Sequence, residues 1–332
     1  MSLLEHAPNL SAELATTLVA DLYGFTTTTT ALPSERDQNF LVATDREKFV
    51  LKIANALEQY ELLEAQNEVL AHLESRVTFC PRVVKTRSGE SVVKILTSTS
   101  PHFVRLVTFI PGTPLAKTNQ TPDLLFDFGR SLGKLRRGLS DFDHDAFHRH
   151  FHWDLANGLR VINDYDVLLP DGTLRDQLDR FASEFERAFS ERLDQLPRSI
   201  IHGDANDYNV IVDNEGIVGL IDFGDMVYSY TVGELSVALA YVVLEKADPL
   251  ACAGKMIAGY LSETSLNENE LELLWPLTLM RLCMSVCMAA FQQQQKPDNE
   301  YLDISQQSIR KSLPQLLAIK PEDVSNLLKQ TL

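Results

Sequence analysis

Residues 199–226 have the sequence SIIHGDANDYNVIVDNEGIVGLIDFGDM, and this stretch constrains the fold more than any other. Three short apolar runs, at 200–201, 210–212 and 217–221, predict strands. The polar residues at 213–216 predict a hairpin turn between the second and third strands. Acidic and amide groups follow the strand ends, where unpaired carboxylates cost free energy. The stretch therefore predicts a site at which these groups surround something positive.

The same stretch predicts phosphoryl-transfer chemistry. The pattern His202-x-Asp204-x-x-x-x-Asn209 puts a carboxylate and an amide on one loop, and Asp222 arrives from a neighbouring strand end. Asn209 and Asp222 offer the oxygen ligands that Mg²⁺ prefers. Asp204 then stays available to orient a hydroxyl group and accept its proton, and Asn206 either orients Asp204 or serves only the turn. Kinases divide these roles in the same way.

The composition is that of a soluble globular protein, with 45% hydrophobic and 23% charged residues among 332. We expect a cytoplasmic protein without a membrane partner, because MSLLEHAPNL does not match a secretory signal and apolar runs are short. The net charge of −16 argues against a nucleic-acid partner. Cys283 and Cys287 are expected to be buried free thiols. The oligomeric state does not follow from the sequence.

The order of predicted elements indicates an α+β chain with two lobes. Residues 1–110 predict an N-lobe with a small antiparallel sheet and one main helix, which opens at a capping box at Asn55 and ends near residue 74. A Pro-Gly-Thr-Pro breaker follows, and residues 111–332 predict a larger, mostly helical C-lobe. A second capping box, Thr231-x-x-Glu234, gives Glu234 a structural role.

The motifs HGDANDYN and IDFGD resemble those of the aminoglycoside phosphotransferase and choline kinase superfamily, a branch of the protein-kinase-like fold. Within it, SERDQNFLV, FVLKIAN, EAQNEVLAHL, FHWDL, IDFGDMVYS and PDNEYL look most like the hydroxylysine-kinase-like group. The resemblance implies ATP or GTP as co-substrate, Asp204 as the catalytic base, and Asn209 and Asp222 as ligands of Mg²⁺. It also implies that His202 supports the loop without reacting.

A kinase-like site needs an interior lysine for the nucleotide phosphates, and the strand KFVLKI supplies Lys52. Phe49, Leu51 and Ile53 alternate with it, so Lys52 lies on the opposite face of the strand. A lysine among apolar neighbours is costly without an anion, which favours a phosphate partner over an exposed edge position.

The helix after this strand offers an unusual partner for Lys52. Helical phase places Gln66 within the apolar stripe, whereas Glu61, Glu64 and Glu68 fall outside it. Gln66 also aligns best with the position where the resembled family carries a glutamate. We therefore expect Gln66 to face the side of the sheet that carries Lys52, although a simple core glutamine remains the alternative.

Two other segments of the N-lobe are candidates for nucleotide binding. ALPSERDQNF lacks a glycine-rich signature, and Arg36 is its candidate phosphate contact, although surface polarity alone gives the same pattern. The backbone of Thr108, Phe109 and Ile110 is expected to contact the base, because the side chains there are mostly apolar.

Several C-lobe residues are candidates for acceptor binding. Trp153 beside Asp154 suits an ammonium group, although Asp154 could equally cap a helix. Asp207 and Asp225 add acids near the predicted cleft. Arg281, in an otherwise apolar helix, is placed to bind a substrate carboxylate or to form a buried ion pair.

The histidine-rich segment DHDAFHRHFHWD, with His144, His148, His150 and His152, suggests a metal site by its composition. We do not expect zinc there, because the segment resembles a family stretch that is not a metal site.

The resulting hypothesis is a small-molecule kinase that phosphorylates the hydroxyl group of an amine or amino acid, with a hydroxylysine-like acceptor first. Homoserine, choline or ethanolamine, and aminoglycosides remain alternative acceptors. A catalytically silent nucleotide-binding module also remains open, because Gln66 departs from the family pattern. A metal-dependent hydrolase is the third possibility, because H-x-D alone fits one.

Overall fold

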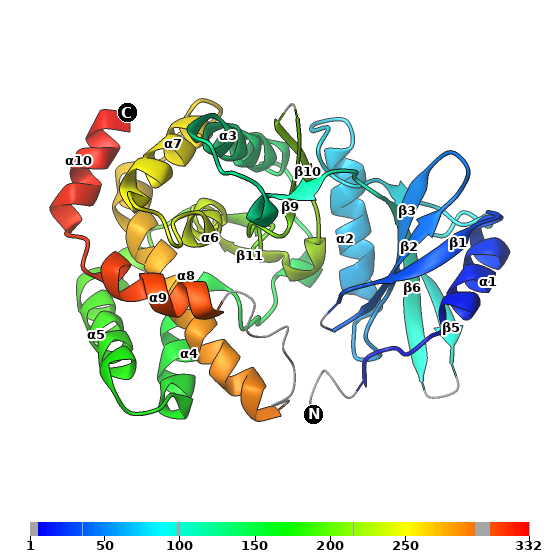
Figure 1. Cartoon of the computed structure of the whole chain (residues 1–332), viewed down its shortest axis with the longest axis horizontal. Helices are drawn as coiled ribbons and strands as arrows, with labels where there is room; N and C mark the ends of the chain where they lie inside the picture. The colour runs from blue at the N-terminus through cyan, green and yellow to red at the C-terminus, as the bar shows by residue number, and fades with distance from the viewer. Residues whose placement is uncertain (1–5, 35, 98–99, 215, 296–305, 332) are drawn as a thin grey trace. The chain divides into compact units, whose positions relative to one another are not determined.

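The computed structural model describes residues 6–34, 36–97, 100–214, 216–295 and 306–331 (Figure 1). The chain divides into two compact units, Met1–Pro111 and Gly112–Leu332. The PDNEYL motif at 297–302 lies outside the described residues.

The N-terminal unit is built on a six-stranded sheet in which all described pairings are antiparallel. Its strand order is β1-β2-β3-β6-β4, with β5 also pairing with β6. The strands are β1 (Thr28–Leu32), β2 (Gln38–Ala43), β3 (Lys48–Ile53), β4 (Val83–Val84), β5 (Val93–Leu96) and β6 (Pro101–Thr108). The predicted small antiparallel sheet is thereby confirmed.

Two helices, α1 (Ala12–Tyr23) and α2 (Tyr60–Leu73), lie on opposite faces of this sheet (Figure 1). Phe49, Leu51 and Ile53 of β3 are buried in the core cluster that includes the apolar face of α1. Since side chains alternate along a strand, Lys52 lies on the face of the sheet away from α1. The predicted alternation along β3 is confirmed.

The expected capping box at Asn55 is wrong, because α2 begins only at Tyr60. The side-chain oxygen of Asn55 accepts from the N–H of Leu57 at 3.1 Å. Its amide nitrogen donates to the carbonyl of Arg36 at 3.2 Å, and its own N–H donates to Asp37 at 3.0 Å. Asn55 therefore anchors a turn against the β1–β2 connection and leaves the helix to start one turn later.

The C-terminal unit is mostly helical, as predicted. Its helices are α3 (Pro122–Gly138), α4 (Gly158–Tyr165), α5 (Thr173–Leu193), α6 (Gly233–Val242), α7 (Pro249–Leu261), α8 (Glu268–Gln295), α9 (Gln306–Leu317) and α10 (Pro321–Thr331). Helix α8 runs through the middle of this unit and contacts α4, α5, α6, α9 and α10 (Figure 1).

Five short strands in the C-terminal unit carry the candidate site. They are β7 (Thr113–Pro114), β8 (Arg198–Ile201), β9 (Val210–Asp213), β10 (Gly216–Leu220) and β11 (Val227–Tyr230). Strands β9 and β10 form the predicted antiparallel hairpin, and β7 extends it. Strand β11, which the sequence did not predict, pairs with β8. The two small sheets hold both ends of the polar loop between β8 and β9.

Helix α8 is the single helix of the described chain that is long and apolar enough to span a bilayer. Of its most apolar window, 94% is buried within the structure, as expected of a core helix. Cys283 and Cys287 lie on α8 as buried free thiols, which confirms that prediction.

Candidate active site

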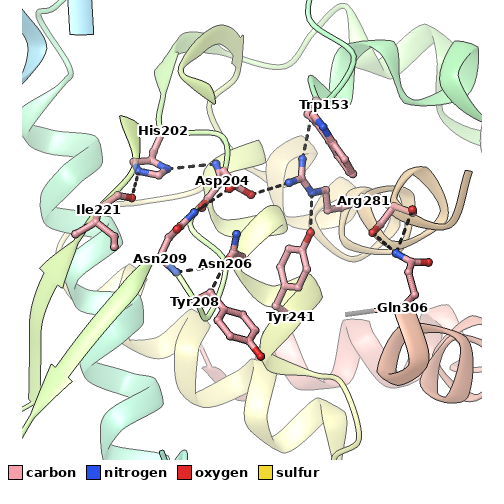
Figure 2. A network of polar contacts seen from close by, with 11 residues as sticks. Trp153, His202, Asp204, Asn206, Tyr208, Asn209, Ile221, Tyr241, Arg281 and Gln306 are labelled. Atoms are coloured by element: carbon pink, nitrogen blue, oxygen red, sulfur yellow. Dashed lines mark hydrogen bonds and ion pairs between the residues drawn. The ribbon is translucent and has the colours of Figure 1, made fainter. Parts of the chain in front are cut away.

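The polar loop begins at His202, directly after β8, and is fixed from two sides. The ring Nε2 of His202 lies 3.0 Å from the carbonyl of Ile221, which precedes Asp222 (Figure 2). The backbone N–H of His202 donates to the carboxylate of Glu234 on α6 at 2.6 Å. Gly203 follows at a φ of 76°, and a Cβ there would lie 2.9 Å from the carbonyl of Asp225. Close packing and backbone conformation both require glycine at this point.

The role of Glu234 corrects the expected capping box. Helix α6 begins at Gly233 without a side-chain cap, and the Thr231 hydroxyl lies 3.0 Å from that of Ser199. Glu234 points instead to the start of the polar loop, and its burial raises the pKa of its carboxyl to about 7. An acid inside the otherwise apolar run GELSVALAYV was the signal that could have indicated this role.

Within the loop, the side chain of Asn209 is tied to Asp204. Its amide nitrogen donates to the Asp204 carboxylate at 2.8 Å and to the Asp204 backbone carbonyl at 2.9 Å (Figure 2). Both bonds use the nitrogen end of the amide, so the oxygen end is the group left to bind a cation.

Asn206 combines the two roles that the sequence left open. Its side-chain oxygen accepts from the N–H groups of Tyr208 and Asn209, at 2.8 and 3.2 Å, which closes the turn. Burial raises the pKa of the Asp204 carboxyl, and a hydrogen bond from the Asn206 side chain partly opposes that rise.

The two predicted metal ligands are brought together by a backbone bond. The N–H of Ile221 donates to the carbonyl of Asn209 at 2.9 Å, which places Asp222 beside the loop. Asp222 has a left-handed backbone, with φ 65° and ψ 71°. This conformation costs a non-glycine residue about 1–2 kcal/mol, a strain typical of functional sites.

The donor set formed by Asn209 and Asp222 fits a magnesium ion that completes its shell with phosphate and water oxygens. Among the described residues, no group of three or more His, Cys, Asp and Glu side chains is arranged to hold a metal.

Asp204 is also bound from the opposite side, by Arg281 of α8. The Nη2 atom of Arg281 lies 2.8 Å from Asp204 Oδ1, and the arginine is 2% exposed. Its Nη1 donates to the carbonyl of Trp153 at 3.1 Å, and its Nε to the Tyr241 hydroxyl at 3.4 Å. Of the two roles open to Arg281, the structure shows the buried ion pair (Figure 2).

The electrostatics of Asp204 reflect this position. Burial raises its pKa above that of an ordinary aspartate, and the nearby Asp225 adds to the rise. The positive charge of Arg281 opposes both effects and favours the ionised carboxylate. Asp204 is thus a half-buried acid whose ionised form is favoured by the neighbouring Arg281.

The carboxylate of Asp154 is already hydrogen-bonded to other residues of the C-terminal unit. It is buried, its Oδ1 caps the 3-10 helix Leu155–Asn157 through the N–H of Ala156 at 2.9 Å, and it accepts from the hydroxyl of Ser229. The structure therefore shows the capping role that the sequence left open. Asp207 is half-buried, and burial raises the pKa of its carboxyl to about 6.

The histidine-rich segment serves the fold. His144 accepts from the N–H of Ala146, and His148 lies 2.7 Å from Asp143 and stacks on Tyr228. The sequence did not indicate Arg149, which donates to the carbonyls of Gly224 and Met226 at 3.0 Å and so holds the loop after Asp222. The histidine-rich composition of the segment drew attention away from this arginine.

In the N-terminal unit, the helical-phase prediction for α2 is confirmed. Gln66 is buried at 1% exposure, whereas Glu61 and Glu68 are exposed and Glu64 is half-buried. The oxygen of Gln66 accepts from Arg105 of β6, and Arg105 also donates to Asn67 at 3.2 Å.

Arg105 is directly opposite Lys52 in the antiparallel register, so both lie on the face of the sheet that Gln66 approaches. At the position of the family's glutamate, Gln66 instead accepts from a buried arginine that Asn67 also binds, which the sequence did not predict.

Two of the other residues predicted to bind the nucleotide already use their backbone N–H groups in hydrogen bonds within the N-terminal unit. The N–H of Thr108 donates to the carbonyl of Arg82 at 2.9 Å, and the N–H of Phe109 to that of Lys48 at 3.0 Å. Base contacts from this segment would therefore use its carbonyl groups or Ile110. The backbone of Arg36 is fixed by Asn55, and its side chain is half-buried.

Comparison with known proteins gives a consistent result. A model of the phosphotransferase enzyme family matches residues 28–270. Hydroxylysine kinase of Xenopus laevis is 30% identical, over 99% of this chain and 96% of its own length.

Among solved structures, an amicoumacin kinase superposes with a TM-score of 0.73 at 15% identity, covering 95% of this chain and 97% of its own. A microcompartment-associated aminopropanol kinase gives 0.72 at 18% identity, covering 97% and 98%. These likenesses confirm the predicted two-lobed, protein-kinase-like α+β fold.

Proposed function

The chain belongs to the phosphotransferase enzyme family and is a small-molecule kinase, and from that premise we propose that it phosphorylates the hydroxyl group of 5-hydroxylysine or a similar hydroxy amino acid. The phosphoryl donor is ATP or GTP. The observation that carries the proposal is the pair of hydrogen bonds that the Asn209 amide nitrogen donates to Asp204, because they join the proposed base and a proposed metal ligand on one loop.

In the proposed reaction, Asp204 accepts the proton of the acceptor hydroxyl. The hydroxyl oxygen forms a bond to the γ-phosphorus, the bond from that phosphorus to the β-phosphate oxygen breaks, and the nucleoside diphosphate leaves. Asn206 and Asn209 hold the loop and the carboxylate in place. Asn209 and Asp222 would hold Mg²⁺, which when bound neutralises charge on the phosphates.

The N-terminal unit would supply the nucleotide contacts. Lys52 and Arg36 are proposed to bind phosphates, and the backbone of residues 108–110 to bind the base. Gln66 would act indirectly, because its oxygen is bonded to Arg105, the register partner of Lys52. These assignments rest on the family resemblance and on the shared face of the sheet.

Aromatic residues near the loop argue against a quaternary ammonium acceptor such as choline, which calls for an open aromatic cage. Arg281 lies 4.5 Å from the centre of the Trp153 ring, and Arg198 lies 4.6 Å from that of Tyr230. Tyr228 is stacked on His148. Of the four aromatic residues near the loop in sequence, Trp153, Tyr228 and Tyr230 are thus already covered, and Tyr208 remains exposed.

An amine that carries hydrogens suits the site better, because it can donate to the acids Asp207 and Asp225. The hydroxylysine kinase relative supports an amino-acid acceptor over an aminoglycoside. We therefore rank hydroxylysine-like amino acids first, then homoserine and ethanolamine-type amino alcohols, and bulky aminoglycosides last. A cytoplasmic location is proposed with this function.

The test is a coupled ADP-release assay with ATP, GTP and a panel of hydroxylated amines. We expect acceptor-dependent turnover, highest for 5-hydroxylysine. An aminoglycoside that exceeds every hydroxy amino acid ten-fold in kcat/KM, which is about 1.4 kcal/mol of transition-state preference, would overturn the ranking.

Two further outcomes of this assay would overturn the function itself. A rate of ADP release that does not increase with any acceptor would indicate a hydrolase. Nucleotide binding without turnover under any condition would indicate a silent nucleotide-binding module.

A further inference from the structure

We infer that Arg281 is a positioning residue for phosphoryl transfer, which fixes the carboxylate of Asp204, and that it does not bind the carboxylate of the acceptor. The inference rests on the proposed function, since it assumes that Asp204 receives the hydroxyl proton. It concerns the buried ion pair between α8 and the polar loop.

The guanidinium of Arg281 has a partner in each of its three directions. Nη2 binds Asp204, Nη1 binds the carbonyl of Trp153 and Nε approaches the hydroxyl of Tyr241. A carboxylate recognised by arginine usually takes two parallel N–H groups from one edge of the fork. Each edge of this fork already carries an acceptor from the protein, so a substrate carboxylate would have to displace one.

The surroundings of Arg281 hold it in place. Its guanidinium lies 4.5 Å from the centre of the Trp153 ring and 5.9 Å from that of Tyr241. The side chain is only 2% exposed, whereas that of Asp204 is 21% exposed. The carboxylate of Asp204, and not the guanidinium of Arg281, is therefore the group of this pair that solvent and an entering acceptor can reach.

Both carboxylate oxygens of Asp204 are hydrogen-bonded within the protein. Arg281 binds Oδ1 at 2.8 Å, and Asn209 binds Oδ2 at 2.8 Å. A carboxylate has about four lone-pair sites, so the bonds from Arg281, Asn209 and Asn206 still leave acceptor capacity for a hydroxyl group. With both oxygens held, the plane of the carboxylate is set before the acceptor arrives, which is the kind of preorganisation that orientation effects require.

This geometry predicts that loss of Arg281 lowers kcat by a similar factor for every acceptor. A loosened carboxylate slows the transfer step whether or not the acceptor carries its own carboxylate. If Arg281 instead bound the carboxylate of the acceptor, its loss would weaken the reaction of amino acids and leave that of amino alcohols unchanged.

The experiment compares Arg281→Met and Arg281→Lys with wild type on two acceptors, 5-hydroxylysine and an amino alcohol without a carboxylate. We expect Arg281→Met to lower kcat by about 10²-fold on both, since small misplacements of reacting groups have effects of this size. KM for the nucleotide should stay unchanged. Arg281→Lys, which keeps a charged donor, should recover part of kcat on both acceptors.

Arg136→Met is the matched control for lost stability. Arg136 also pairs with a buried acid, Glu270, at 3.2 Å, and lies 5.9 Å from the ring centre of Tyr260. Its contacts are on α7 and α8, outside the polar loop. We expect it to lower thermal stability while leaving kcat near wild type.

The outcomes separate the two claims. A rise in KM confined to 5-hydroxylysine, with the amino alcohol unaffected, would show a substrate-binding role and overturn the inference. Full kcat in Arg281→Met would also overturn it and leave the proposed function intact. A wild-type protein that phosphorylates no acceptor would refute the proposed function and the positioning role with it.

Discussion

The carboxylate of Glu234 accepts a hydrogen bond from the backbone N–H of His202 at 2.6 Å, so helix α6 fixes the first residue of the polar loop. Glu234 is 2% exposed, and its burial raises the pKa of its carboxyl from 4.5 to about 7. The residue that anchors the loop is therefore also one whose ionisation opposes folding near neutral pH.

Replacing Glu234 with glutamine should change how stability depends on pH. Because the folded-state pKa lies above the unfolded value, the wild type gains stability from the protonated acid at low pH and loses it between about pH 4.5 and 7. Glu234→Gln does not titrate, so its stability relative to wild type should rise over that window. The gain should be on the order of 3 kcal/mol, since one pKa unit is worth ~1.4 kcal/mol.

Denaturant unfolding of both proteins at pH 4.5, 6 and 8 measures this difference. The account would be contradicted if the free energy of unfolding of Glu234→Gln, relative to that of wild type, stayed constant or fell as the pH rises.

Removal of the Asp222 carboxylate should change the metal dependence of nucleotide binding. We expect Asp222→Ala to bind Mg-ATP more weakly than wild type and to need more Mg²⁺, because one of two protein oxygen ligands is lost. Calorimetric titration at several Mg²⁺ concentrations measures the effect, with metal-free ATP as the reference. If affinity and metal dependence both match wild type, the ligands lie elsewhere.

The contact between Gln66 and Arg105 should contribute to the stability of the N-terminal unit. Arg105→Leu leaves two buried amide oxygens, of Gln66 and Asn67, without that donor, and each such loss costs about 1–3 kcal/mol. Combining it with Gln66→Leu should cost less than the sum of the single changes. Chemical denaturation of the four proteins gives the coupling energy, and strictly additive effects would argue that the contact is not formed in solution.

Local patterns explain which parts of the site followed from the sequence. The β9–β10 hairpin and the position of Gln66 depend on turn residues and helical phase within a few residues, and both were predicted. The side-by-side placement of Asn209 and Asp222 followed from the hairpin that joins them.

Distant pairings explain what the sequence could not supply. Arg281 and Asp204 are 77 residues apart, and Arg105 and Gln66 are 39 apart. No periodicity links such partners, since tertiary packing alone brings them together. The two capping boxes failed for a related reason, because Asn55 and Glu234 are hydrogen-bonded to residues distant in the sequence and not to the helix ends nearby.

The most direct test of the central claim is the turnover of Asp204→Asn with 5-hydroxylysine as acceptor. If Asp204 orients and deprotonates the acceptor hydroxyl, kcat should fall by about 10²–10⁴-fold while Mg-ATP affinity stays near wild type. Asp213→Asn, at the exposed end of β9, is the matched control and should keep full activity. A kcat for Asp204→Asn equal to that of wild type would contradict the account.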